Sequence, residues 1–170
     1  MRISQSVVGR WIVALFAIVT LQTGSALAQP VRADLGWQTY VDQRGGTSVQ
    51  FPSNLFRVPA GETEQGIGKI FRTEDGRAEF SAYSLDNETR ETPRSYLQKK
   101  LRVDVSKIDY RRVTDRFFVV SGVRDGQVYY SRCNFHGRMH CVYMSYPASE
   151  TRAWDGIVTR VSHSLRGRRG

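Results

Sequence analysis

The fold is decided by residues 117–146, FFVVSGVRDGQVYYSRCNFHGRMHCVYMSY, which contain both cysteines of the chain. Asp125-Gly126 is the two-residue signal of a β-hairpin, because a type I′ turn needs positive φ at both central positions. A second reversal is expected around Gly137, in a three-residue loop. The stretch therefore predicts three consecutive antiparallel strands.

The second turn determines how the two cysteines face each other. With a loop centred on Gly137, Cys133 lies directly across from Cys141. Directly opposed residues in an antiparallel pair have Cβ atoms about 4.5–5.5 Å apart, so a disulfide needs only a slight adjustment of the strands. Redox-active cysteines usually lie close in sequence at a helix N-terminus, whereas seven residues separate these two. We therefore predict a structural disulfide between Cys133 and Cys141.

Side chains alternate between the two faces of a strand, so the register also assigns each residue to a face. One face carries Val119, Val123, Val128, Tyr130, Val142, Met144 and Tyr146. The other carries Phe118, Val120, Tyr129, both cysteines and Tyr143. A sheet that is apolar on both faces needs cover on both. The sequence predicts an α+β fold with an antiparallel β-sheet covered by helices on both faces, an α/β/α sandwich.

Shorter hydrophobic runs, separated by turn residues, predict the rest of the sheet. These strands are expected over residues 37–42, 47–51, 68–73, 77–84 and 108–113. Pro52 ends the second of them, because proline has no N–H to donate to a neighbouring strand. Residues 53–66 contain Pro59, Gly61 and Gly66 among polar residues, which is typical of a surface loop.

A helix is predicted to start at Thr92-Pro93, with threonine as the N-cap and proline at the first helical position. Its apolar side is formed by Tyr96, Leu97, Leu101 and Val105.

A second helix is predicted after Pro147, where apolar residues recur at the spacing of one helix face. These residues are Trp154, Ile157, Val158, Val161 and Leu165. Ser149 is the expected N-cap, and Gly167 is expected to close the helix.

The first residues have the features of a targeting segment. Two arginines precede an apolar core over residues 11–21, and Ala26-Leu27-Ala28 is an A-x-A cleavage signal. An apolar run of about 11 residues is too short to span a bilayer comfortably. We predict a signal peptide over residues 1–28 that is cleaved after Ala28. The mature chain would then lack a transmembrane segment and lie in the periplasm or be secreted.

The mature chain is expected to form a single α+β domain over residues 37–166. A flexible leader over 29–36 precedes this domain, and a disordered basic tail over 167–170 follows it. Export agrees with the presence of two cysteines, because disulfides persist in oxidising compartments.

The chain is basic, with a formal net charge of +9, of which +7 remains after Arg2 and Arg10 are removed. A basic balance outside the cytoplasm indicates attraction to anionic surfaces or acidic partners. The candidate contacts for an anionic partner are Arg132, Arg138, Arg166, Arg168 and Arg169.

No motif for a metal, a cofactor or catalysis stands out. His136 and His140 flank the hairpin turn, where they are expected to be exposed and to point apart, and no Asp or Glu between residues 127 and 148 completes a metal site. Residues 66–69, GIGK, lack the full phosphate-loop pattern, and no G-x-S-x-G nucleophile elbow is present. The strand tyrosines beside Arg132 are expected to pack under helices rather than to stack on nucleic-acid bases.

This order of elements resembles the Mog1/PsbP-like fold, an antiparallel sheet between helices. The likeness lies in Tyr40 with residues 46–56 (GTSVQFPSNLF) and in the closing helix 154–165 (WDGIVTRVSHSL). The hairpin cysteines are not part of that general pattern. Members of the fold assist photosystem assembly or bind a small GTPase, so the resemblance implies a non-catalytic accessory domain. The sequence is also similar in style to small exported domains of Gram-negative bacteria.

Our leading hypothesis is an exported, non-catalytic binding or assembly domain of the cell envelope. One alternative is a periplasmic hydrolase with a site built from loops such as 53–66, with His136 or His163 beside a buried carboxylate. Another alternative is a protein that binds anionic surfaces through its basic charge.

Overall fold

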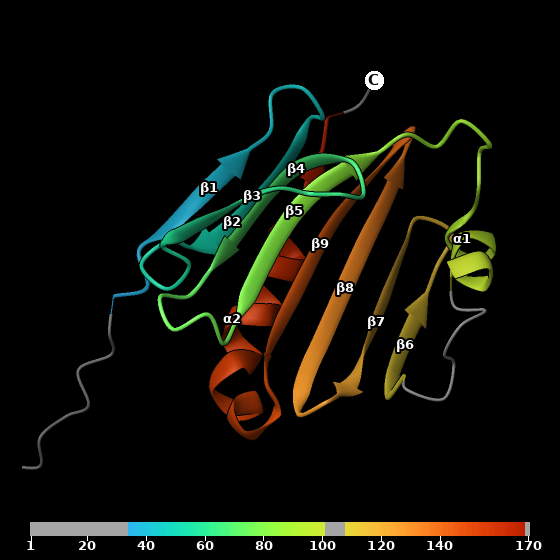
Figure 1. Ribbon diagram of the computed structural model, residues 1–170. Helices are drawn as coiled ribbons and strands as arrows, with labels where there is room; N and C mark the ends of the chain where they lie inside the picture. The colour runs from blue at the N-terminus through green and yellow to red at the C-terminus, as the bar shows by residue number, and fades with distance from the viewer. Residues whose placement is uncertain (1–33, 101–107, 169–170) are drawn as a thin grey trace, which may run out of the picture. The chain divides into compact units, whose positions relative to one another are not determined.

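The computed structural model describes residues 34–100 and 108–168, which belong to one compact unit that begins at Ala33. The signal peptide and residues 29–33 of the predicted leader lie outside the described ranges, as do Leu101, Val105 and Arg169. Within the described ranges no helix combines the length and the apolar character needed to cross a bilayer. Over the described residues, the chain forms two antiparallel sheets and two α-helices (Figure 1).

The large sheet has seven strands in the order β3-β4-β5-β9-β8-β7-β6 (Figure 1). Its strands are β3 (Val58–Glu62), β4 (Ile67–Arg72), β5 (Glu79–Leu85), β6 (Tyr110–Val113), β7 (Phe117–Arg124), β8 (Gln127–His136) and β9 (Arg138–Pro147). The predicted three-stranded unit is therefore β7-β8-β9, and β9 is the central strand. The expectation of a surface loop over residues 53–66 is wrong at Val58–Glu62, which form an edge strand.

The register predicted from the two turns is confirmed. Asp125 and Gly126 both have positive φ, 50° and 75°, and Cys133 lies opposite Cys141. Gly137 also has positive φ, 77°, in the turn between β8 and β9. The second turn thus brings the cysteines together.

The small sheet has the order β1-β2-β10 and contains both ends of the domain. Its strands are β1 (Trp37–Val41), β2 (Thr47–Pro52) and β10 (Arg166–Gly167). The expected start of the disordered tail is wrong, because Gly167 pairs with Thr47 and the Arg168 N–H donates to the Gly46 carbonyl. The end of the expected leader is also ordered, since Ser53 N–H donates to the Gly36 carbonyl.

Helix α2 (Thr151–Ser164) and the small sheet cover one face of the large sheet. The predicted apolar face of the helix is confirmed, because Trp154, Val161 and Leu165 are buried in the main core. A 3-10 turn, Ala148–Glu150, precedes the helix, and Glu150 occupies the N-cap position without a capping side-chain hydrogen bond. Ser149 is therefore not the N-cap.

The opposite face of the large sheet has its own core around the disulfide, in which Leu97 of α1 (Pro93–Lys100) packs against Phe118 and Cys133. The predicted cap of α1 is confirmed, because Thr92 Oγ1 accepts a hydrogen bond from Ser95 N at 3.2 Å. The α+β class and the antiparallel sheet are confirmed as well. Helix α1 contacts part of this second face. Over the rest of the face, cover by a helix stays a prediction.

Candidate functional site

A groove of about 590 Å³ runs beside α2, over the part of the large sheet that α2 leaves uncovered. Strands β7 and β8 form its floor with Val123, Val128 and Tyr130, and Val158 of α2 forms part of its wall. Val123 exposes 46% of its surface, and Tyr110 on the edge strand β6 exposes 50%. Apolar side chains that gather along a groove, rather than singly, mark a candidate interaction site, so this groove is a candidate binding surface.

The groove has polar groups at fixed positions. The Tyr130 hydroxyl donates to Ser162 Oγ of α2 at 2.6 Å, which ties the floor to the wall. Burial raises the pKa of the Tyr130 phenol. The pKa of the Tyr146 phenol is also raised, mainly by burial and in addition by the nearby Asp155. Both phenols are therefore neutral hydrogen-bonding groups near neutral pH. A partner that enters the groove therefore meets tyrosine, which combines apolar area with a hydrogen-bonding tip.

Arg132 lies on the same face of β8 as Tyr130, two positions further along the strand. Its Nε donates to Asn134 Oδ1 at 3.0 Å, and its Nη1 donates to Ser162 Oγ at 3.2 Å. The guanidinium also lies over the Phe117 ring, 4.5 Å from the centroid. Neutral groups thus hold this half-buried cation in place, and no acidic side chain among the described residues forms an ion pair with it.

Two further arginines lie close to this side chain. Burial lowers the pKa of the Arg132 guanidinium, and the positive charges of Arg166 and Arg112 lower it further. Arg112 also lies over the Phe117 ring, on the side of strand β6. We call Arg112, Arg132 and Arg166 the arginine cluster. Their mutual repulsion would be relieved by an anion, so the cluster favours an acidic partner.

The arginines expected to contact an anionic partner are therefore only partly brought together. Arg132 and Arg166 belong to the cluster, whereas Arg138 is engaged by Asp86 at 2.6 Å. Arg168 is exposed beside the small sheet, and Arg169 lies outside the described residues. Sequence reasoning missed Arg112, although its alternation with Val113 on a predicted strand placed it on a definite face.

The disulfide Cys133–Cys141 is confirmed, with a Cα–Cα distance of 4.1 Å. Both cysteines are buried in the core on the face opposite to the groove. The bond therefore joins the neighbouring strands β8 and β9 and faces away from the groove.

The histidine expected to be exposed at the hairpin turn, His140, is fully buried, with 0% exposure. It faces the small sheet, where its Nδ1 shares a hydrogen bond of 2.9 Å with Thr47 Oγ1. Gly167 packs against the imidazole so closely that a Cβ there would lie 2.0 Å from its Cδ2. The expectation was wrong because the small sheet folds over this end of β9, whereas His136 on the other side of the turn is exposed.

Acid is expected to destabilise the domain through His140. Burial, followed by the charges of Arg138 and His136, lowers the pKa of the folded-state imidazole below its usual value of about 6.5. The unfolded chain then takes up the proton first, so the stabilisation is complete above about pH 6.5 and falls below it, by at most about 1.4 kcal/mol per pH unit. Urea unfolding from pH 7.5 to 5 measures this slope.

The His140→Gln variant should have a shallower slope over the same pH range, whatever its absolute stability. His163→Gln, at an exposed position on α2, retains the buried histidine and is the matched control. Equal slopes for wild type and His140→Gln would contradict the assignment.

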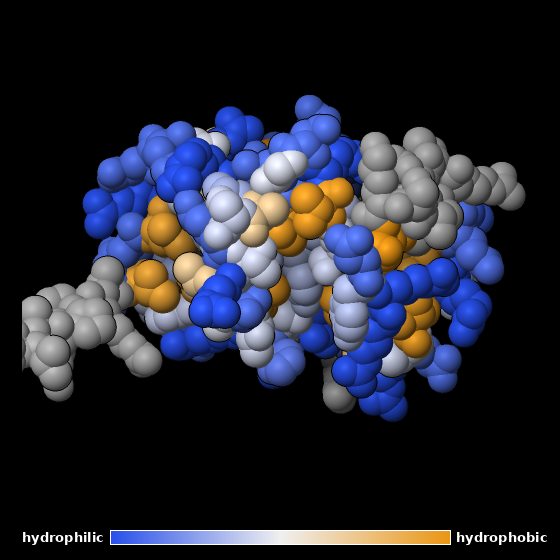
Figure 2. All heavy atoms as spheres, turned by 90° about the horizontal axis from the view of Figure 1, so that it is seen from below, coloured by the Kyte–Doolittle hydropathy of each residue, from blue (hydrophilic) through white to orange (hydrophobic). Residues whose placement is uncertain are grey.

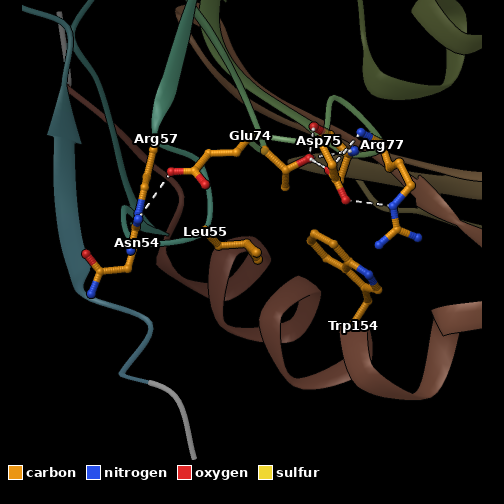
Figure 3. Close-up of a pocket in the computed structure, with 9 residues that line it drawn as sticks. Asn54, Leu55, Arg57, Glu74, Asp75, Arg77 and Trp154 are labelled. Atoms are coloured by element: carbon orange, nitrogen blue, oxygen red, sulfur yellow. Dashed lines mark hydrogen bonds and ion pairs between the residues drawn. The ribbon is translucent and has the colours of Figure 1, made fainter.

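Figure 3 shows a second pocket, of about 390 Å³, between the loop after β2, the β4–β5 turn and the start of α2. Leu55 and Trp154 point into it. The charged groups on its rim are paired: Arg57 with Glu74 at 3.2 Å, and Arg77 with Asp75 at 2.6 Å. Because these charges neutralise one another, the pocket offers no free ionic group to a ligand.

Two pockets formed by the described residues each lack part of the set of groups that the hydrolase hypothesis requires. The pocket of Figure 3 uses the loop after β2 and has carboxylates, but no histidine lines it. His163 lines another pocket, beside the small sheet, in which no carboxylate takes part. No group of three or more His, Cys, Asp or Glu residues within 34–100 and 108–168 is placed to hold a metal ion.

Seen from below, the domain shows hydrophobic side chains in separate clusters among hydrophilic ones (Figure 2). Hydrophobic area that is divided in this way does not by itself mark a large permanent interface.

Comparisons with known proteins show the fold alone. No protein-family model matches the sequence, and the comparison with curated proteins found no match. Among solved structures, the chain is similar to the solution structure of cyanobacterial PsbP (CyanoP) from Synechocystis sp. PCC 6803. The TM-score is 0.57 at 12% sequence identity, and the match covers 78% of this chain and 92% of that chain. The chain therefore has a PsbP-like fold.

Proposed function

We propose that this protein is an exported accessory domain, without catalysis of its own, that binds a protein partner of the cell envelope through the groove beside α2 and the arginine cluster. The observation that carries the proposal is the junction at Ser162, where the half-buried Tyr130 of the groove and the cation of Arg132 bind the same hydroxyl. Tyrosine and arginine are the side chains that most often dominate binding energy at interfaces. The PsbP-like fold supports an accessory role.

The surface also indicates the chemistry of the partner. The groove, which Asp109 and Asp155 also line, accepts an apolar side chain against Val123 and Val128. The arginine cluster lies beyond Tyr130, outside the groove lining, and accepts a carboxylate there. Arginine binds carboxylates with two parallel hydrogen bonds, which adds specificity to the charge attraction. The complementary partner segment therefore has an acidic residue next to apolar ones.

Export is supported by the N-terminal sequence and by the disulfide. The N-terminal sequence has the pattern of a cleavable signal peptide. The domain contains a formed disulfide, and such bonds persist in the periplasm and outside the cell but are rare in the cytosol. A β-lactamase fused after residue 170 should therefore confer ampicillin resistance only when residues 1–28 are present.

Photo-cross-linking tests the binding surface. A benzoylphenylalanine at Val123 is expected to give a discrete cross-linked product in cells, because this position lies in the groove. Val58 is the matched control, since it is a valine of similar exposure, 41%, on β3, at the far edge of the same sheet. Gel mobility and mass spectrometry identify the product.

Arg112→Gln in the Val123 probe strain should lower the yield of this product severalfold, because it removes one charge of the cluster. A product of equal yield from Val58, or none from Val123, would contradict the proposed surface. Turnover of a substrate by the purified protein would contradict the non-catalytic role.

A further inference from the structure

The pocket that holds His163 lies on the other side of α2, between the helix and the small sheet, and has a volume of about 520 Å³. Its lining is entirely polar or basic, and none of its side chains is acidic. Arg160 and His163 come from α2, Arg166 from β10, and the hydroxyls of Thr39 and Ser48 from the small sheet. Groups of one sign of charge thus converge on one hollow.

The cations in this pocket are held in place by neutral groups. Arg160 donates through Nε to Gln50 Oε1 at 3.0 Å and lies over the Trp37 ring, 4.2 Å from its centroid. Arg166 donates through Nη1 to the carbonyls of His163 and Leu165, at 2.6 and 2.9 Å. These contacts fix each guanidinium without cancelling its charge, so little conformational freedom is left to lose on binding.

Several donors in the pocket are unused. Within the described ranges, the two terminal nitrogens of Arg160 and the imidazole of His163 have no hydrogen-bond partner. The same holds for the hydroxyls of Thr39 and Ser48. An arginine carries five N–H donors in a planar fork, of which Arg160 uses one. The unused donors therefore come from both walls of the pocket.

We propose that this pocket is a binding site for a phosphate-type oxyanion, either free or as the headgroup of an anionic phospholipid. A tetrahedral oxyanion presents oxygens in several directions and can accept from the helix wall and the sheet wall together, whereas a carboxylate has two oxygens in one plane. The pocket shares Arg166 with the arginine cluster but is separate from the groove itself, because Arg160 and the groove residue Val158 project from different sides of the helix.

Titration of the purified, oxidised protein with inorganic phosphate at low ionic strength tests the site. Backbone amide NMR signals of Ser48, Gln50 and His163 should shift in a saturable manner. Arg160→Gln should weaken the affinity at least about tenfold, which is the usual effect of losing a hydrogen bond to a charged group. Arg152→Gln removes the same charge from an exposed position two turns earlier on α2 and should change the affinity less than twofold.

Sedimentation with vesicles of phosphatidylglycerol and phosphatidylcholine at physiological salt distinguishes a free oxyanion from a phospholipid headgroup. Vesicle binding that Arg160→Gln abolishes and Arg152→Gln preserves assigns the site to a phospholipid headgroup. If phosphate binding is saturable and vesicle binding does not depend on Arg160, the site binds a free oxyanion. The site is overturned if the three amides do not shift, or if the two variants lose affinity equally, since that result reflects diffuse charge alone. None of these outcomes depends on the Val123 cross-link.

Discussion

Replacing Phe80 by alanine is expected to lower the free energy of unfolding by about 4 kcal/mol, which is within the usual range for a buried phenylalanine. Phe80 is fully buried on β5. Its ring stacks on Phe51 of the small sheet, with centroids 5.4 Å apart, and lies 5.6 Å from Phe56. The substitution therefore leaves a cavity where the two sheets meet.

Urea unfolding followed by tryptophan fluorescence measures this loss. Phe80→Leu keeps most of the volume and should cost less than half as much. Phe135→Ala is a second comparison, because Phe135 is only half-buried and lies in the core on the opposite face. If Phe80→Ala cost no more than Phe135→Ala, the contact between the sheets would not be the centre of stability.

Loss of the disulfide is expected to lower the free energy of unfolding by roughly 2.5 kcal/mol, from the loop-closure entropy of a bridge that spans a short loop. Cys133 and Cys141 are eight positions apart, and both are buried in one core. Without the bond, the unfolded chain regains the freedom of the β8–β9 turn. Neighbouring strand hydrogen bonds would still hold the register.

The variant with both Cys133→Ala and Cys141→Ala is the direct test, because alanine adds no buried polar group. Comparison of the wild-type protein with and without a reductant is the second measurement, and it removes the bond without changing the sequence. A midpoint of unfolding that is the same in the reduced and oxidised protein would contradict the expected stabilisation. So would thiol labelling that finds both sulfurs free in the exported protein.

The strands β7 to β9 and helix α2 could be predicted because their signals are local. Asp125-Gly126 fixes the first turn through its backbone conformation, and Gly137 marks the second. The apolar spacing of α2 is similarly clear within one stretch of sequence. Strand β3 was missed because Pro59 and Gly61 are typical of loops, yet an edge strand tolerates them since it is paired on one side only.

The candidate site was harder to predict because it depends on contacts between distant segments. The burial of His140 is set by Thr47, which is 93 positions away in the sequence. The groove exists because α2 covers part of one sheet face and leaves the rest open, and the apolar pattern of the helix does not reveal the width of that cover. Arg132 was expected at a binding surface, but the convergence of Arg112 and Arg166 on it needed the three-dimensional order of the strands.

The central position of β9 determines when the large sheet can form during synthesis. The three strands β3, β4 and β5 meet the three strands β6, β7 and β8 only through β9, which ends at Pro147. A nascent chain shorter than this can form separate hairpins but cannot close the sheet. The sheet can therefore close only late in synthesis, which is compatible with the export that we propose.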